Sequence, residues 1–271
     1  MLRRIEKILR QHNFEFFQPH TIQEQGIYTI NMLSPLLALI SLAFSQRTCA
    51  VLLIPSYPPG ILGTAAPFAA LAHDTLTNSP GAASVLVGDA GLYKTSVTGF
   101  PPGIITGTLY IADAVAMKAL VDATTAYNDL KGQLLPKHLS TLDGQTLLPG
   151  VYSASSSLQL AGSGAAKLTL DAANNPHAVW VFQIGSTLTT GAGGVATMAM
   201  IRGGSPLNVY WQVSSSATLG ISNPSFFLGN IIAEDSVSIG SGVILGTVVA
   251  LTGAITIADA ICIGWLTLYI R

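Results

Sequence analysis

Residue types that support catalysis or metal binding are few in this chain, and their spacing forms no recognisable site. No two histidines stand at a ligand spacing, and the motifs HExxH, GxSxG and CxxC are absent, as is a P-loop. The histidines are His12, His20, His73, His138 and His177. Glu234 and Asp235 are the only adjacent acids, and we expect them at a solvated turn rather than in an acid–base pair. These residues therefore offer no recognisable catalytic or metal-binding site.

Hydroxyl-bearing and small residues take the place that charged residues usually hold. Charged residues make up 9% of the chain and hydrophobic residues 49%, whereas about a quarter of a typical globular chain is charged. The segment QIGSTLTTGAGGVATMAM, residues 183–200, carries no charge at all. The net charge of −1 gives no basic surface for nucleic acid. The composition predicts a polar but uncharged surface and excludes a nucleic-acid partner.

The first 50 residues are typical of a targeting segment. The basic stretch MLRRIEKILR is followed by an apolar run at residues 33–44, which has the length of a signal-peptide core and is short for a membrane span. Residues 45–50 would then hold the cleavage site, which predicts a secreted protein. If residues 1–31 are retained, residues 27–44 could instead anchor the chain in a membrane.

The residues that follow divide into a linker and one domain. Residues 51–61 contain three prolines and a glycine, which is typical of a linker, and we expect the domain to span residues 62–271. Of the two cysteines, Cys49 would be removed with the leader. Cys262 would then be a small buried apolar residue rather than half of a disulfide.

One segment, residues 111–131, has the periodicity of an amphipathic helix. Lys118, Asp122 and Asp129 fall opposite a wide apolar arc, and Gly132 is a suitable stop. The arc consists of Ala114, Ala116, Met117, Ala119, Leu120, Val121, Ala123 and Tyr127. Its small side chains would let the helix approach a flat partner closely.

From about residue 146 onward, short strands alternate with turns of glycine, serine and asparagine. Thr218, Ser238 and Thr256 each lie between two apolar or small residues and recur along the chain at nearly equal intervals. Strand alternation places these hydroxyls outward and the following Leu or Ile inward. A regular interval of about 20 residues predicts a β-helix with one coil per repeat.

Two glycine-rich stretches resemble motifs of other protein classes, but neither stretch has all the residues that its motif requires. SIGSGVILG (238–246) resembles one rung of the left-handed β-helix of hexapeptide acyltransferases, but those enzymes need many consecutive hexads and a catalytic histidine. GSGAAKL (162–168) lacks the spacing of a P-loop, so we interpret it as a turn.

Seven stretches in order resemble the DUF3494-type ice-binding proteins and cover nearly all of residues 62–258. They are LGTAAPFAALAHDTLTN (62–78), SVTGFPPGIITGTLYIADAVA (96–116), TTAYND (124–129), TLLPGVYSASSSLQL (146–160), NPHAVWVFQIGSTLTT (175–190), NVYWQVSSSATLG (208–220) and FLGNIIAEDSVSIGSGVILGTVVALTGAITI (227–257). The resemblance implies a mostly β fold, a discontinuous right-handed parallel β-helix of triangular section with one long helix alongside. It also implies a monomer that binds ice or ordered water and inhibits ice growth and recrystallisation. Such a protein is not an enzyme and uses no cofactor and no metal.

Two surfaces are candidates for the ice-binding face. In the family it follows small-residue turns with a loose T-A/G-x-T pattern, which Thr190-Gly191-Ala192 and Ser241-Gly242-Val243 match only at their start. Ile244 departs from that pattern, and residues 223–226 depart further. The second candidate is the ladder of hydroxyls described above. The candidate residues are Thr189, Thr190, Ala192, Thr218, Ser222, Ser225, Ser238, Ser241, Val243 and Thr256.

An alternative of a different class is a secreted or cell-surface β-helix adhesin or cell-wall binding module. Such a protein would present aromatic platforms to a polysaccharide. Trp180, Trp211 and Trp265 stand in apolar strand contexts, so we expect them in the core. The C-terminal stretch ADAICIGWLTLYIR (258–271) departs from the family by being apolar, and left bare it would favour aggregation.

Overall fold

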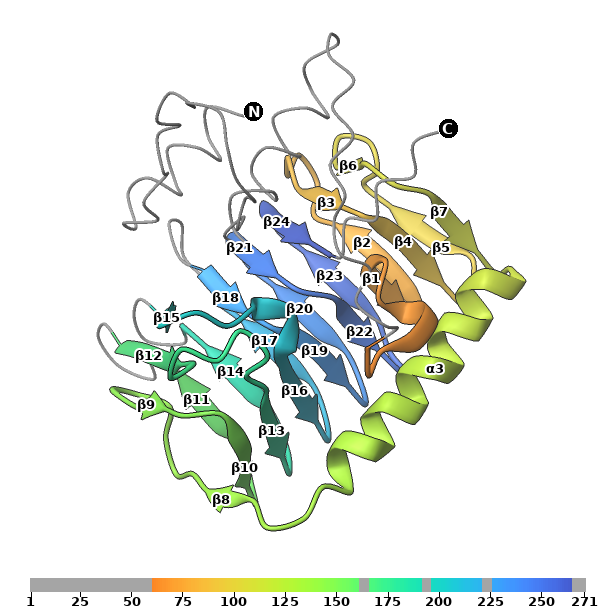
Figure 1. Ribbon diagram of the computed structural model, residues 1–271. Coiled ribbons are helices and arrows are strands. Elements are labelled where there is room, and N and C mark those ends of the chain that lie inside the picture. Colours follow the sequence, from red (N-terminus) through yellow and green to blue (C-terminus); the bar gives the residue numbers. More distant parts are fainter. Residues whose placement is uncertain (1–59, 161–165, 192–195, 221–225, 265–271) are drawn as a thin grey trace, which may run out of the picture. The chain divides into compact units, whose positions relative to one another are not determined.

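The computed structural model of the chain describes residues 60–160, 166–191, 196–220 and 226–264 (Figure 1). These residues belong to one compact unit, Pro59–Arg271. The predictions about a leader and a linker before residue 60 lie outside the described residues. So do the predictions about Ala192, Ser222, Ser225 and Trp265.

The described strands form the three walls of a parallel β-helix, as predicted. Sheet A contains, in spatial order, β7 (Leu109–Ile111), β4 (Asp89–Leu92), β1 (Phe68–Ala72), β22 (Val248–Ala250), β19 (Asn230–Ala233), β16 (Val209–Val213), β13 (Trp180–Ile184), β10 (Gly150–Ala154) and β8 (Lys137–His138). Sheet B contains β11 (Leu158–Leu160), β14 (Leu188–Thr190), β17 (Ala217–Leu219), β20 (Val237–Ile239), β23 (Ile255–Ile257), β2 (Thr75–Asn78) and β5 (Ser96–Thr98).

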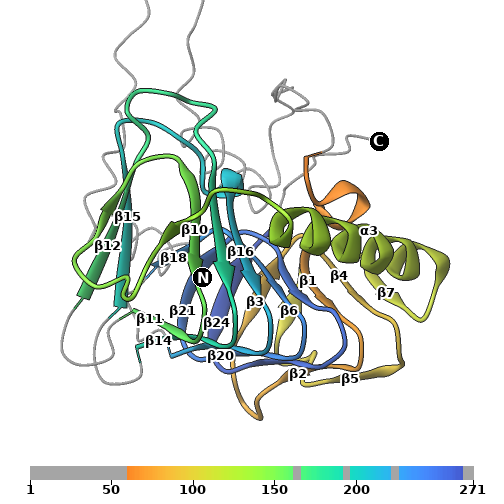
Figure 2. The same cartoon turned by 90° about the horizontal axis from the view of Figure 1, so that it is seen from below.

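The third wall consists of two shorter sheets. Sheet D holds β15 (Ala196–Ile201), β12 (Ala166–Asp171) and β9 (Thr146–Leu147). Sheet C holds β18 (Phe226–Leu228), β21 (Gly242–Leu245), β24 (Ala260–Ile263), β3 (Val85–Val87) and β6 (Ile104–Ile105). Figure 2 shows sheet B along the lower edge of the section and the helix outside a different wall.

The order of the coils along the axis differs from their order in the sequence. The first coils, β1–β3 and β4–β6, are followed by β7 and the helix, after which the chain starts again at β8. Later coils then stack back until β22, β23 and β24 pair with β1, β2 and β3. Ala70 thus lies beside Val248, and Leu76 beside Ile255. This closure makes the β-helix discontinuous, as the family resemblance implies.

Aromatic side chains fill one end of the interior. The rings of Tyr152, Phe182 and Trp211 succeed one another on neighbouring strands of sheet A, with centroid distances of 5.6 and 3.9 Å. The ring of Phe227, on β18 of sheet C, lies 5.1 Å from that of Trp211 across the interior. Trp180 and Trp211 are fully buried, and their indole N–H groups donate to backbone carbonyls, as buried tryptophans usually require. The prediction that these two tryptophans belong to the core is confirmed.

Helix α3 (Ala114–Lys131) lies along the outside of sheet A (Figure 1). It begins three residues later than predicted, because Ile111 completes β7 and the Asp113 carboxylate caps the helix by accepting a hydrogen bond from Ala116 N at 2.8 Å. The predicted arc is too wide: Ala114, Met117 and Val121 are exposed, since sheet A is flat and touches only the middle of the arc.

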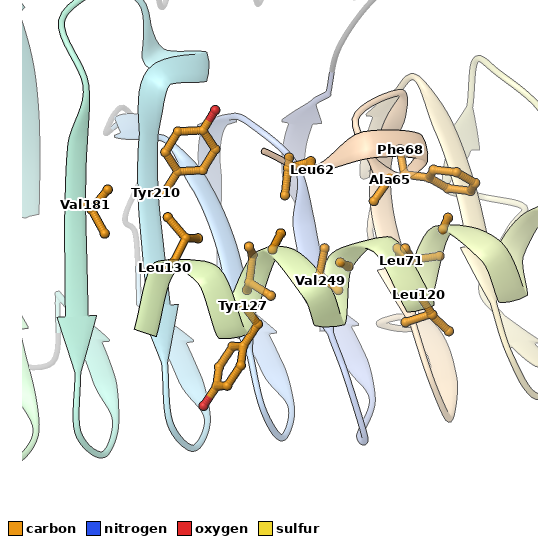
Figure 3. Close-up of a cluster of buried hydrophobic side chains, with 14 residues drawn as sticks. Leu62, Ala65, Phe68, Leu71, Leu120, Tyr127, Leu130, Val181, Tyr210 and Val249 are labelled. Atoms are coloured by element: carbon orange, nitrogen blue, oxygen red, sulfur yellow. The ribbon is translucent and has the colours of Figure 1, made fainter. Parts of the chain in front are cut away.

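Small helix residues bring α3 close to the sheet, and polar contacts fix its position. The buried cluster joins helix residues such as Ala119 and Ala123 to outward side chains of sheet A, among them Val249 (Figure 3). The amide of Gln183 on β13 donates to the carbonyl oxygens of Leu130 and Gln133 at 2.8 and 2.9 Å, which satisfies the end of the helix. The helix thus stiffens wall A and leaves wall B uncovered by any described helix.

The opening turn of the domain is tied to the same helix. Thr64, in the short helix η1 (Gly63–Ala65), donates from its backbone N–H and its hydroxyl to the Asp122 carboxylate at 3.0 and 2.7 Å. Lys118 also donates to this carboxylate. These hydrogen bonds lower the pKa of Asp122 from 3.8 to about 2; the bond from Lys118 has the largest effect, and the bond from the Thr64 side chain the next largest.

Candidate functional site

Each strand of sheet B contributes one outward side chain to a single straight column in register. In register, the residues are Gln159, Thr189, Thr218, Ser238, Thr256, Thr77 and Thr98. We call this set the central column. Six of its seven members carry a hydroxyl, and every member is exposed or half-buried. Neighbouring strands in a sheet lie about 4.7–4.9 Å apart, so the column repeats at that interval.

Most hydroxyls of the central column are available to water. Thr98 donates to the Thr77 hydroxyl at 3.3 Å. Within the described residues, no hydrogen bond joins the side chains of Thr189, Thr218 or Thr256 to another protein group. A hydroxyl can donate one hydrogen bond and accept two, so a row of them offers both functions to a surface of water molecules.

Two flanking columns complete the outer surface of sheet B. On one side, two residues before each central residue, stand Ser157, Thr187, Ser216, Ser236, Ala254, Thr75 and Ser96, and the backbone ladder keeps these positions aligned. Several of their hydroxyls bond within the protein, such as Thr187 to Ser157 at 2.8 Å. On the other side the ladder continues through Gly191, Gly220, Gly240, Ala258 and Ser79. The small residues keep this side of the surface low and flat.

The three columns contain no titratable side chain. Charges gather instead at the turns between sheets A and B, where Glu234 and Asp235 are exposed as predicted. At the same edge Asp74 accepts hydrogen bonds from Lys94 and His73, which together lower the pKa of its carboxyl. Binding through sheet B would therefore depend on hydrogen bonding and shape rather than on charge.

The interior holds this surface rigid. On either side of each central residue an inward side chain is buried, as with Ala217 and Leu219 around Thr218 and Val237 and Ile239 around Ser238. Close-packed interiors of this kind resist deformation. A preformed surface need not lose conformational entropy when it meets a solid.

The structure brings four predicted residues together on the central column: Thr189, Thr218, Ser238 and Thr256. The prediction that Thr218, Ser238 and Thr256 align is confirmed by their register. Ser241 lies in the turn between β20 and β21, off the column.

Two predicted face residues prove to be buried, which corrects the prediction. Thr190 is 1% exposed because strand alternation turns it inward when Thr189 faces out, and its hydroxyl has no hydrogen-bond partner in the described residues. Val243 is 3% exposed and lies on β21 in sheet C, not on sheet B. The T-A/G-x-T pattern therefore does not identify the exposed surface in this chain.

Sequence analysis missed three members of the central column, namely Gln159, Thr77 and Thr98. Thr77 and Thr98 belong to the first coils, which stack beside the last coil only in the folded chain. A signal was present, because both are hydroxyls next to apolar residues and their separation in the sequence is close to the interval of the later ladder. Gln159 carries an amide in place of a hydroxyl, so the pattern of hydroxyls did not include it.

Two further features of the described residues concern metal ligands and helix length. No group of three or more His, Cys, Asp or Glu residues there could hold a metal ion. None of the helices described is both long and apolar enough to cross a membrane. Cys262 is fully buried as predicted, and burial raises the pKa of its thiol to about 12.

Comparisons with known proteins agree with this fold. The family model described as Ice-binding-like matches residues 70–262. An ice-binding protein of Nostoc sp. (strain HG1) is 45% identical over 201 residues, which cover 72% of this chain and 71% of that protein. An ice-binding protein from an Antarctic biological consortium, known from its crystal structure, is 38% identical with a TM-score of 0.69, over 80% of this chain and 96% of that one. One from the Antarctic ascomycete Antarctomyces psychrotrophicus is 36% identical with a TM-score of 0.66, over 76% and 98%.

Proposed function

Because this chain belongs to the Ice-binding-like family, we propose that it binds ice through the outer surface of sheet B. The observation that carries the proposal is the central column, a straight row of uncharged polar side chains on parallel strands. Relatives named as ice-binding proteins support the activity, and the register of this chain supports the surface. The adhesin alternative has no support, because Trp180 and Trp211, two of its candidate aromatic platforms, are buried.

The surface would bind by adding many weak contacts at regular intervals. A single hydroxyl in water gains little, because it exchanges one hydrogen-bond partner for another. Seven side chains on one rigid sheet meet a solid together, so once the first contact forms the others follow without a further loss of translational freedom. A bound molecule then prevents the ice beneath it from growing and from recrystallising.

The lack of charge on sheet B suits this mechanism. A charged side chain holds its hydration shell strongly, and stripping that shell against a solid would cost free energy. Hydroxyl and small side chains order nearby water without such a cost. The γ-methyl groups of the threonines add apolar contact area between the hydroxyls.

We also propose that the chain acts as a secreted monomer that is not an enzyme and uses no cofactor or metal. The central column lies entirely on one chain, so no second copy is required to complete it. The apolar run at residues 33–44 and the basic stretch before it support export. N-terminal sequencing of the exported protein tests this: a start produced by cleavage within residues 45–50 is expected, and a retained apolar run would favour the anchored form.

The activity is tested by adding the purified full chain to polycrystalline ice. We expect faceted crystals and grains that stay small on annealing, since adsorbed protein blocks the growth of the planes to which it binds. An inert protein of similar size serves as the control. Round crystals that coarsen freely, in a sample whose circular dichroism shows a folded β protein, would contradict the proposal.

A further inference from the structure

The loop between helix α3 and strand β8 holds the most exposed large hydrophobic residues of the described chain. Leu134 and Leu135 are 84% and 95% exposed, whereas the next such residue among those described, Val121, is 60% exposed. A single exposed leucine is ordinary on a protein surface, but two adjacent leucines that are almost completely exposed require an explanation. Figure 1 shows this loop along the lower edge of the molecule, outside the sheets. We call residues 134–136, Leu-Leu-Pro, the leucine tip.

The backbone of the leucine tip is held in a conformation that leucine disfavours. Leu135 has a φ of 57°, in the left-handed region where the Cβ atom crowds the following carbonyl oxygen. The next residue is Pro136, and a residue before proline normally has an extended backbone. Glycine is the usual residue where the chain is left-handed. Backbone strain of this kind persists only where the surrounding structure imposes it, and it is concentrated at functional sites.

Both ends of the leucine tip are anchored to sheet A. Just before the tip, the carbonyl oxygen of Gln133 accepts a hydrogen bond from the Gln183 amide at 2.9 Å. Directly after the tip, β8 pairs with β10, and the Leu139 N–H donates to Ser153 O at 2.7 Å. The two leucines are therefore presented to solvent from a fixed base, and they do not belong to a long unsupported loop.

Positive charge gathers on both sides of the leucine tip. Between Asp129 and Asp143 the chain carries three basic residues and no acid. The basic residues are Lys131, Lys137 and His138, and all three are exposed. The whole chain has a net charge of −1, so this segment is positive relative to the average of the chain.

Aromatic rings hold the two lysines at this end of the β-helix. The Nζ atoms of Lys131 and Lys137 lie 5.4 and 5.8 Å from the ring centroids of Tyr127 and Tyr152, within the range of a cation–π contact. The Tyr152 hydroxyl also donates to the carbonyl oxygen of Leu148 at 2.6 Å, and Leu148 is 49% exposed. Since β8 and β9 are the edge strands of sheets A and D, a third exposed leucine lies at the same end of the coils.

We propose that the leucine tip inserts into the headgroup region of a lipid bilayer that contains anionic phospholipids. The leucine side chains would leave water for the acyl chains, while the two lysines on either side would meet the lipid phosphates. A stable protein partner would need about 800 Å² of contact surface, which a projecting tip of three residues does not offer, whereas a bilayer accommodates a projecting group. The tip lies at the end of sheet A and the central column on sheet B, so this activity does not depend on ice binding.

Sedimentation of the full chain with lipid vesicles tests the proposal. We expect binding to vesicles of phosphatidylcholine and phosphatidylglycerol in equal parts, and weaker binding in high salt or to phosphatidylcholine alone, because the lysines face the anionic surface. Leu135→Asp should bind at least about tenfold more weakly, since burial of one leucine side chain changes an equilibrium constant by about that factor or more. Val121→Asp puts the same charge at another exposed apolar position of α3, and this matched control should bind as the parent does.

Two further variants separate lipid binding from folding. Leu135→Gly fits the left-handed backbone, so it should unfold at the same temperature as the parent or higher, yet bind the mixed vesicles about tenfold more weakly. Leu134→Trp reports the position of the tip directly. Compared with the parent, its additional fluorescence should be quenched by lipids with brominated acyl chains, which act only on an indole inside the bilayer.

Four results would overturn the proposal. One is a folded parent chain that stays in solution with every vesicle. A second is equal binding of the parent and Leu135→Asp, which would assign attachment to another part of the sequence, such as the apolar run at residues 33–44. A third is equal binding to neutral and anionic vesicles. The fourth is a native dimer that Leu135→Asp dissociates, which would make a second copy the partner of the tip.

Discussion

Replacing Thr218 by tyrosine should abolish most ice binding without unfolding the protein. Thr218 lies in the middle of the central column, between Thr189 and Ser238 on strands about 4.7–4.9 Å away. A phenol ring there would stand above these neighbours and hold a flat solid away from them. A gap of only about 0.5–1 Å forfeits a quarter to a half of a van der Waals contact, so we expect thermal hysteresis to fall by at least about half.

The stability of the variant should be unchanged, which separates a surface effect from a folding effect. The side chain of Thr218 is exposed and forms no hydrogen bond with a described residue, so the free energy of unfolding should change by no more than about 0.5 kcal/mol. Thermal hysteresis, crystal shape and a denaturant melt are measured on the same preparation.

Two matched variants make the result specific. Thr218→Ser keeps the hydroxyl and the flat profile, and should retain most of the activity. Thr169→Tyr places the same ring on an outward position of β12 in the third wall, and should bind ice as the parent does. The reasoning is refuted if Thr218→Tyr shapes ice like the parent, or if Thr169→Tyr is the variant that loses activity.

Three further predictions concern pH, the helix anchor and the core. Ice activity should stay constant between about pH 5 and pH 9, because the outer columns of sheet B contain no titratable group; a steep pH profile of thermal hysteresis would contradict this. Asp122→Asn should lower the free energy of unfolding by about 1–2 kcal/mol at neutral pH. Since the pKa of Asp122 is lowered from 3.8 to about 2, this difference should persist above pH 3.8 and vanish as the pH falls through about 2, as acid titration of both proteins would show. Trp211→Ala should cost about 3–5 kcal/mol in a urea melt, because it empties the middle of the aromatic stack; a loss below about 1 kcal/mol would mean that the stack relaxes to fill the cavity.

The fold class could be predicted from the chain because its signals are local and repeated. Hydroxyls between apolar residues recur at a nearly constant interval, and a coil can satisfy that repeat only by stacking in register. The helix was predictable within three residues at its start and with the correct end, since its apolar period and its stop at Gly132 are local. The exposure of Met117 and Val121 could not be predicted, because the width of the contact between the helix and sheet A depends on the shape of the sheet.

The candidate binding surface was only partly predictable. The alternation of residues in β17, β20 and β23 was enough to align Thr218, Ser238 and Thr256. A motif borrowed from the family placed Thr190 and Val243 on the face, and the structure buries both. A motif specifies residue types at a spacing, whereas exposure depends on which wall of the coil a strand joins.

The sequence by itself determined that this protein is a solenoid with an uncharged surface and without a recognisable catalytic site. These properties depend on composition and on a regular repeat interval, and both can be seen in the sequence without the fold. Only the tertiary structure decided that Thr77 and Thr98 extend the column that begins at Gln159, because β2 and β23 come from opposite ends of the domain sequence and meet only when the coils close. The physical reason is that the first coils cannot bury their apolar edges alone, and the last coil supplies the matching edge.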